Sequence, residues 1–272
     1  MKALAHILRS DAPAPPESLE AWWAREQASP WTSSADRALV GGWEGGRMGW
    51  AFASGYQAAA AALFADRSQV WAMCATEDGG NHPRAIRTSL RGSRLYGAKA
   101  FVTLAEFATR LAVIFRDGEV DGRPSLRLAI VRAEDAEMQA LPRLPMVPEI
   151  GHARCVLDGV EPLEVLDGDA YLGVLKPFRT IEDIHVLLAF CGLVLRYGAG
   201  RNRAASAAVA LSALAERDPL DPAVHVALGG VFEDLDGLGP GIPEWARDGA
   251  LLKIAGKARA RRLERAWAQM SS

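Results

Sequence analysis

The sequence predicts an α+β protein in which an antiparallel β-barrel or sandwich is followed by a bundle of helices. Two observations lead to this fold class. Between residues 69 and 174, short apolar runs alternate with turn dipeptides such as Asp-Gly and Arg-Gly, and no helix-length segment separates them. After Pro177, apolar residues instead recur with the 3.6-residue spacing of an amphipathic helix.

These patterns divide the chain into three predicted domains. They are a residual N-terminal helical segment at 1–66, a β middle domain at 67–176 and a C-terminal helical bundle at 177–272. Within the middle domain we predict strands at 70–76, 86–90, 95–103, 111–115, 126–131 and 154–157, with a break at Asp117-Gly118. The N-terminal segment is shorter than a full helical domain.

Local signals place the helices. In the N-terminal segment, Ser18 suits the N-cap of a short helix, and residues 47–65 form a second helix of small residues. The glycine-rich stretch 41–46 between them predicts a turn-rich connector. In the bundle, Thr180 is the expected N-cap of the first helix, and Asp221-Pro222 opens a later one as N-cap and first helical residue. Further helices are predicted at 201–217 and from Pro243 onward.

Composition excludes several classes of protein. The chain has 31 basic and 33 acidic residues, so its formal charge of −2 gives no general attraction to nucleic acid. No apolar run approaches the roughly 20 residues that a membrane helix needs, and the N-terminus lacks the apolar core of a signal peptide. The three cysteines are far apart and odd in number, which indicates reduced, buried thiols in a cytoplasmic protein.

Four segments in order carry a family resemblance. Residues 75–80 read ATEDGG, residues 95–103 read LYGAKAFVT, residues 156–162 read VLDGVEP, and Val165-Leu166 follow them. They resemble the T-E-P-x-x-G-S-D start, the L-x-G-x-K-x-W-I-T strand, the F-D-x-V-x-V-P stretch and the later V-L-G of the acyl-CoA dehydrogenases. Phe101 takes the place of the tryptophan. The resemblance extends over approximately residues 48–200, and it implies a shortened, divergent member of that family.

The resemblance implies a flavin site and a reaction. Thr76, Phe101 and Thr103 would contact the isoalloxazine ring of FAD, with an acyl-CoA thioester on the other face of the ring. The reaction would be FAD-dependent oxidation of the thioester at its CH–CH bond, in a homo-oligomer. Asn81 and His82 replace the serine and aspartate of the family segment, so contacts to the FAD pyrophosphate or to CoA do not carry over.

Glu182 is the candidate catalytic base. The usual glutamate of the family, in a late loop that resembles Y-E-G-T, has no counterpart in this sequence, and a minority of members place the base on the first helix after the β domain. Glu182 holds a comparable position, where the positive end of a helix would favour the carboxylate. It is also an ordinary capping residue of a first helical turn. Glu182 and His185 form a single E-x-x-H, half of a di-iron signature, and the histidines show no metal spacing.

Two functions therefore remain open. Thr76, Phe101 and Thr103 are also residue types that strands and cores use without any ligand. The alternative to an enzyme is a non-catalytic relative that keeps the fold for binding or oligomer assembly. A basic run near the C-terminus has two interpretations as well, either a solvated helix face or a site for the CoA 3′-phosphate. The run comprises Lys253, Lys257, Arg259, Arg261, Arg262 and Arg265.

Overall fold

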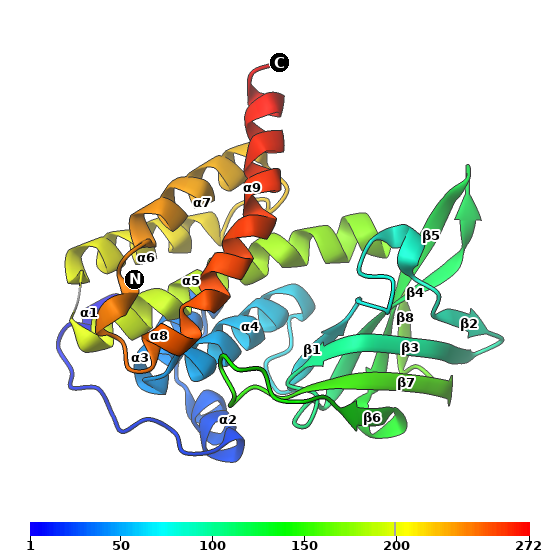
Figure 1. Ribbon diagram of the computed structural model, residues 1–272, viewed down its shortest axis with the longest axis horizontal. Coiled ribbons are helices and arrows are strands. Elements are labelled where there is room, and N and C mark those ends of the chain that lie inside the picture. Colours follow the sequence, from blue (N-terminus) through cyan, green and yellow to red (C-terminus); the bar gives the residue numbers. More distant parts are fainter. Residues whose placement is uncertain (199) are drawn as a thin grey trace. The chain divides into compact units, whose positions relative to one another are not determined.

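A computed structural model describes residues 1–198 and 200–272, which form two compact units (Figure 1). The helical unit comprises Met1–Ala65, Leu144–Glu149 and Phe178–Ser272, and the sheet unit comprises Asp66–Arg143 and Ile150–Pro177. The six-residue segment Leu144–Glu149 thus belongs to the helices, although both of its neighbours in the chain belong to the sheet unit. None of the helices in the described ranges is long and apolar enough to cross a membrane.

The helices include the expected ones and, in addition, helices at Lys2–Ile7 and Ser34–Gly45 that the sequence patterns did not predict. They are α1 (Lys2–Ile7), α2 (Leu19–Ala28), α3 (Ser34–Gly45), α4 (Met48–Phe64), α5 (Lys176–Tyr197), α6 (Arg201–Leu214), α7 (Pro222–Leu235), α8 (Trp245–Asp248) and α9 (Ala250–Met270). Two predicted N-caps are confirmed. The Ser18 side chain accepts a hydrogen bond from Ala21 N, and the Asp221 side chain accepts one from Ala223 N.

The connector predicted at residues 41–46 is wrong. Its first five residues lie in α3, and Gly46 ends the helix in the left-handed conformation, with φ of 67°. The glycines serve close helix packing: a Cβ placed on Gly42 would lie 1.8 Å from the carbonyl oxygen of Ala189 in α5, and one on Gly192 would lie 1.9 Å from that of Leu39. Glycine is therefore used at this crossing to bring two backbones into contact.

The N-cap predicted at Thr180 is also wrong. A π-turn at Tyr171–Leu175 leads directly into α5, whose first residue is Lys176. Thr180 therefore lies inside the helix, where it is only 1% exposed. Asp169 caps the actual start, since its side chain accepts hydrogen bonds from the amides of Tyr171 and Leu172.

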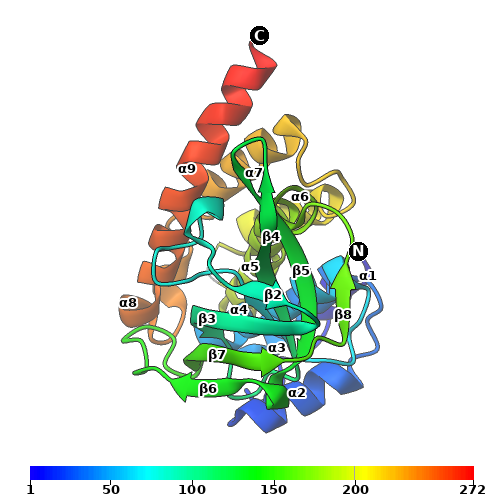
Figure 2. The same cartoon turned by 90° about the vertical axis from the view of Figure 1, so that its right-hand side faces the viewer.

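In the part of the chain that the structure describes, eight strands form one mixed sheet (Figures 1 and 2). They are β1 (Trp71–Cys74), β2 (Ser89–Arg91), β3 (Arg94–Thr103), β4 (Arg110–Val120), β5 (Arg123–Arg132), β6 (Glu137–Ala140), β7 (His152–Val160) and β8 (Glu164–Leu166). Their order is β6-β7-β3-β2-β4-β5-β8, and β1 pairs with β4.

The predicted α+β class is confirmed, with two differences in the sheet. The pairs β1–β4 and β2–β4 are parallel, so the sheet is mixed, and over the described residues it is not closed into a barrel. The break expected at Asp117-Gly118 is instead a bulge within β4, and the hairpin turn follows at Asp121-Gly122, where φ is 50° and 70°. The sequence pattern missed the short strands β6 and β8, which lie at the two ends of the strand order.

One face of the sheet builds a hydrophobic core. Residues from β1, β3, β4, β5 and β7 contribute to it, including Cys74, Leu95, Phe115, Val131 and Leu157. Because side chains alternate along a strand, the intervening residues of β3 and β7 point to the opposite face. That face carries the candidate site.

Candidate functional site

A tight turn lies directly beside β3 in the sheet unit. Glu77 and Gly80 exchange two backbone hydrogen bonds, of 3.0 and 2.8 Å. Just before this turn, the carbonyl oxygen of Thr76 accepts a hydrogen bond from Ala100 N at 2.8 Å. Two of the family-like segments, far apart in the sequence, are therefore hydrogen-bonded neighbours.

A buried ion pair ties the turn to the strand. Lys99 Nζ lies 2.8 Å from Glu77 Oε1, and it also donates to the carbonyl oxygen of Ile114. Glu77 further accepts from Arg87 N at 2.7 Å and from the amide and hydroxyl of Thr88 at 3.0 and 2.7 Å. Burial raises the pKa of Glu77, but Lys99 and Thr88 outweigh it and leave the pKa below its ordinary value. Glu77 and Lys99, the glutamate and lysine of the two motifs, thus hold the turn in place beside β3.

A bulge in β3 turns Phe101 outward. The pairing with β7 shifts register between Lys99 and Val102, and both of these side chains are fully buried. Phe101, between them, is 40% exposed. Thr103 at the end of the strand lies opposite His152 of β7. The outer face of β3 thus presents an aromatic ring and a hydroxyl two residues apart.

His152 completes the aromatic part of the site, and sequence reasoning missed it. Its ring stacks on Phe101 with centroids 4.2 Å apart and an interplanar angle of 28°. The residue is only 8% exposed, and within the described part of the chain its Nδ1 has no hydrogen-bond partner. Burial lowers the pKa of His152, and the charge of Arg143 lowers it further against the opposing effect of Glu106. The imidazole is therefore neutral at pH 7.

A second ion pair of the site lies beside the turn. Arg154, on β7, donates to both carboxylate oxygens of Asp78 at 2.6 and 3.1 Å. The hydrogen bond from Arg154 and its positive charge hold the pKa of Asp78 below its usual value. In residues 1–198 and 200–272, the hydroxyls of Thr76 and Thr103 have no hydrogen-bond partner, so both are available to a ligand.

These side chains fit one part of a flavin. A flat ring system can pack on the Phe101–His152 stack, while the hydroxyls of Thr76 and Thr103 offer donors to ring nitrogens and carbonyls. At Asn81 and His82, where the sequence differs from the family motif, we find no corresponding fit to the pyrophosphate of FAD. His82 Nδ1 accepts from Arg84 N and caps a short 3₁₀ turn, which is a local structural role.

Glu182 lies in α5 of the helical unit, whereas Thr76, Phe101 and Thr103 lie in the sheet unit. Because α5 begins at Lys176, Glu182 occupies its second turn and is not an N-terminal capping residue. Burial, and then the charge of Asp183, raise the pKa of Glu182 to about 7. A carboxyl with that pKa can exchange a proton near neutrality.

We expect Glu182 to make stability depend on pH. Because its pKa is about 7 in the folded chain and near 4.5 when unfolded, it favours folding below pH 4.5, and this contribution is lost as the pH rises through about 7. The free energy of unfolding of Glu182→Gln should exceed that of the wild type above pH 7 by up to about 3 kcal/mol, relative to their difference at acid pH. Urea titrations at several pH values measure this. Equal pH slopes for the two proteins would contradict it, and Glu264→Gln, at an exposed position, is the control.

The single E-x-x-H does not form a metal site. His185 is buried, and both of its ring nitrogens are occupied, Nδ1 by the Ile181 carbonyl oxygen at 2.7 Å and Nε2 by Ser34 Oγ at 2.9 Å. No group of three or more His, Cys, Asp or Glu suited to a metal occurs among the residues that the structure describes. His185 therefore joins α5 to α3.

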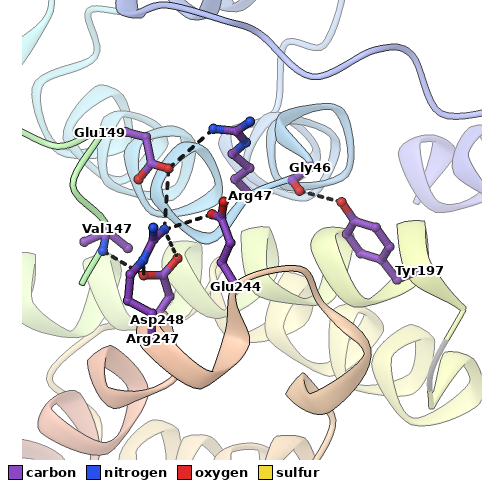
Figure 3. Close-up of polar contacts among 8 residues, drawn as sticks. All are labelled: Gly46, Arg47, Val147, Glu149, Tyr197, Glu244, Arg247 and Asp248. Carbon is purple, nitrogen blue, oxygen red and sulfur yellow. Dashed lines mark hydrogen bonds and ion pairs between the residues drawn. The ribbon is translucent and has the colours of Figure 1, made fainter. Parts of the chain in front are cut away.

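A second polar cluster, in the helical unit, surrounds Arg247 (Figure 3). Its guanidinium contacts Asp248 at 2.7 Å, Glu244 at 2.8 Å and Glu149 at 3.8 Å. The fully buried Asp248 also accepts from Val147 N at 2.9 Å. These contacts fix the segment Leu144–Glu149 onto α8, because Val147 N and the Glu149 carboxylate both meet a charged residue of that helix.

Two residues of this cluster have unusual backbone conformations. Val147 has φ of 42° and Glu244 has φ of 64°, and a positive φ is rare for a β-branched residue. Glu149 Oε2 is buried without a hydrogen-bond partner in the described part of the chain, and a Cβ on Gly49 would lie 2.5 Å from it. The surrounding ion pairs hold this strained arrangement in place.

Comparisons with known proteins identify the fold. No protein-family model matches the sequence, and no curated protein matches it. Among solved structures, butyryl-CoA dehydrogenase from Megasphaera elsdenii matches with a TM-score of 0.64 at 9% identity, over 92% of this chain and 90% of that one. An FAD-dependent dehydrogenase matches with a TM-score of 0.63 at 13% identity, over 98% and 91% of the two chains.

The prolyl acyl carrier protein oxidase AnaB also matches, with a TM-score of 0.62 at 13% identity, over 92% of this chain and 85% of that one. All of these identities are low, so the likeness concerns the fold. The chain has an acyl-CoA dehydrogenase-like fold, as the four sequence segments predict.

Proposed function

We propose that this protein binds FAD and acts as an acyl-CoA dehydrogenase-like flavoprotein on an acyl thioester. The proposal rests mainly on the hydrogen bond from Ala100 N to the Thr76 carbonyl oxygen. This bond makes the Thr76 turn a neighbour of the strand that bears Phe101 and Thr103. The solved structures of similar fold support the proposal, because they include an FAD-dependent dehydrogenase, a butyryl-CoA dehydrogenase and an acyl carrier protein oxidase.

In this proposal each residue has a defined task. Phe101, backed by His152, provides the flat surface for the ring, and the hydroxyls of Thr76 and Thr103 orient it through hydrogen bonds. Bound FAD would supply the hydride acceptor for oxidation of the CH–CH bond. Glu182 is the proposed base for the α-proton of the thioester, a role that its raised pKa of about 7 supports.

FAD binding tests the proposal directly. We expect the purified chain to carry or take up FAD, seen as the visible absorbance band of the flavin. Phe101→Ala should weaken this binding about tenfold, because loss of an aromatic contact surface removes on the order of 1–1.5 kcal/mol. Val120→Ala, which trims a 62% exposed side chain at another hairpin, should bind FAD like the wild type. A colourless protein that ignores added FAD would end the proposal.

That negative outcome would favour the second candidate function, a non-catalytic relative used for assembly. One observation supports it: α9 exposes three large apolar side chains, Ile254, Trp267 and Met270, each more than half exposed. A homo-oligomer in which α9 contributes to the interface would cover them. In either version we propose a cytoplasmic protein, since Cys74, Cys155 and Cys191 are buried and unpaired.

A further inference from the structure

A cavity of about 150 Å³ lies between α5, α7 and α9 in the helical unit. Figure 1 shows these three helices, and the contacts of Asp183 in α5 with Arg259 and Arg262 in α9 join two of them. Leu228 and Phe232 of α7 and Leu263 of α9 give the cavity apolar walls. It therefore combines a hydrocarbon surface with a charged one.

Arg259 provides the polar wall, and part of its hydrogen-bonding capacity is unused. The residue is only 8% exposed. Its Nη2 donates to Asp183 Oδ1 at 2.8 Å, and its guanidinium lies over the ring of Phe232 at 4.3 Å. Nε and Nη1 are buried and have no partner in the described residues. Buried N–H groups are normally satisfied, so these donors indicate a missing acceptor.

The charge around the cavity favours an anion. One carboxylate, Asp183, faces two guanidinium groups, those of Arg259 and Arg262. Burial lowers the pKa of His225, and the charge of Arg262 lowers it further, so the imidazole adds no positive charge at pH 7. Glu233 also lines the cavity, but its side chain is exposed to solvent. Glu182 also interacts electrostatically with Arg259 and Arg262, but its pKa of about 7 leaves it only partly ionised at neutral pH, so the wall keeps a net positive charge.

We propose that this cavity binds a small monocarboxylate of about three to five carbons. The carboxylate accepts hydrogen bonds from the free donors of Arg259, and the hydrocarbon body lies against Leu228 and Leu263. The size follows from the volume, since an apolar cavity of about 150 Å³ accommodates a molecule of the size of benzene. A charge-assisted hydrogen bond inside a partly apolar cavity is stronger than a neutral one.

Propionate is the probe, and propionamide, of similar size but uncharged, is its control. Ligand-observed saturation-transfer NMR at constant ionic strength should give saturable propionate binding with a Kd in roughly the millimolar range. The Arg Nε–H resonance that disappears in Arg259→Gln should shift during the titration. Arg259→Gln should weaken binding about tenfold or more. Arg261→Gln removes an exposed charge from the same helix and should leave the affinity unchanged.

A second variant keeps the test decisive if Arg259→Gln does not fold. In Gly256→Ala the new Cβ would lie 3.1 Å from Phe232 Cε1, which narrows the cavity, while alanine favours the helix. It should weaken propionate binding in a chain that melts no lower than the wild type. Equal binding of propionamide, full affinity in Arg259→Gln or Gly256→Ala, or a similar loss in Arg261→Gln would each overturn the proposal.

Discussion

Replacing Lys99 with methionine is expected to lower the free energy of unfolding by about 3–5 kcal/mol. The reason is the burial of both partners: the Lys99 side chain is fully buried, and that of Glu77 is 7% exposed. Methionine fills much of the same volume but leaves the Glu77 carboxylate without its counter-ion. Urea unfolding at pH 7 measures the change. A loss below about 1 kcal/mol, the value of an exposed ion pair, would contradict the assigned role.

The double variant Glu77→Gln with Lys99→Met separates the missing charge from the missing contact. Removing both charges should recover part of the stability lost in Lys99→Met, because no unpaired carboxylate remains. Recovery should be incomplete, since the glutamine amide would face Arg87 N, which now donates to Glu77 Oε2 at 2.7 Å. If the double variant is the least stable of the three, the ion pair is not the main reason for the loss.

Gly42→Ala is expected to destabilise the helical unit by about 3 kcal/mol, the upper end of the range for overpacking. The added Cβ would lie 1.8 Å from the carbonyl oxygen of Ala189 and 2.7 Å from its Cα, and both are backbone atoms. Because no side chain can turn aside, α3 and α5 must separate. Thermal and urea unfolding measure the effect.

Gly230→Ala is the matched control for this substitution. Gly230 also lies in a helix, α7, but a Cβ at that position meets no atom within 4 Å. The same change should therefore stabilise the chain by up to about 1 kcal/mol through helix propensity alone. Equal effects of the two variants would show that the crossing of α3 and α5 tolerates a methyl group.

Much of the fold could be predicted because its signals are local. Ser18 and Asp221 cap helices through their own side chains, and residues 95–103, a strand-length apolar run, lie in β3. The turn prediction for residues 41–46 was wrong because glycine occurs both in turns and at close contacts between helices. The contact that explains the glycine here is with Ala189, which is far away in the chain. The parallel pairing of β1 with β4 joins Trp71 to Arg110 and has no local signal either.

The candidate site, like the fold, could be predicted from the sequence only in part. The family resemblance implies that Thr76 and Phe101 contact the same ring and therefore lie close together, and the structure brings their two segments together. Their role toward FAD stays a prediction. His152 and Arg154 could not be found in this way, because they join the site through the register of β7 against β3 and through a side-chain contact with Asp78.

The helical unit is built from three separate stretches of the chain, and Leu144–Glu149 is the one that lies within the sequence of the sheet unit. A fragment of residues 66–177 carries these six residues without the helices that hold them, so Val147 N loses Asp248 and Glu149 loses Arg247. The complementary fragments 1–65 and 178–272 keep Glu244 and Asp248 beside Arg247 but lack Glu149. We therefore expect either half to be less stable when it is expressed alone than as part of the whole chain.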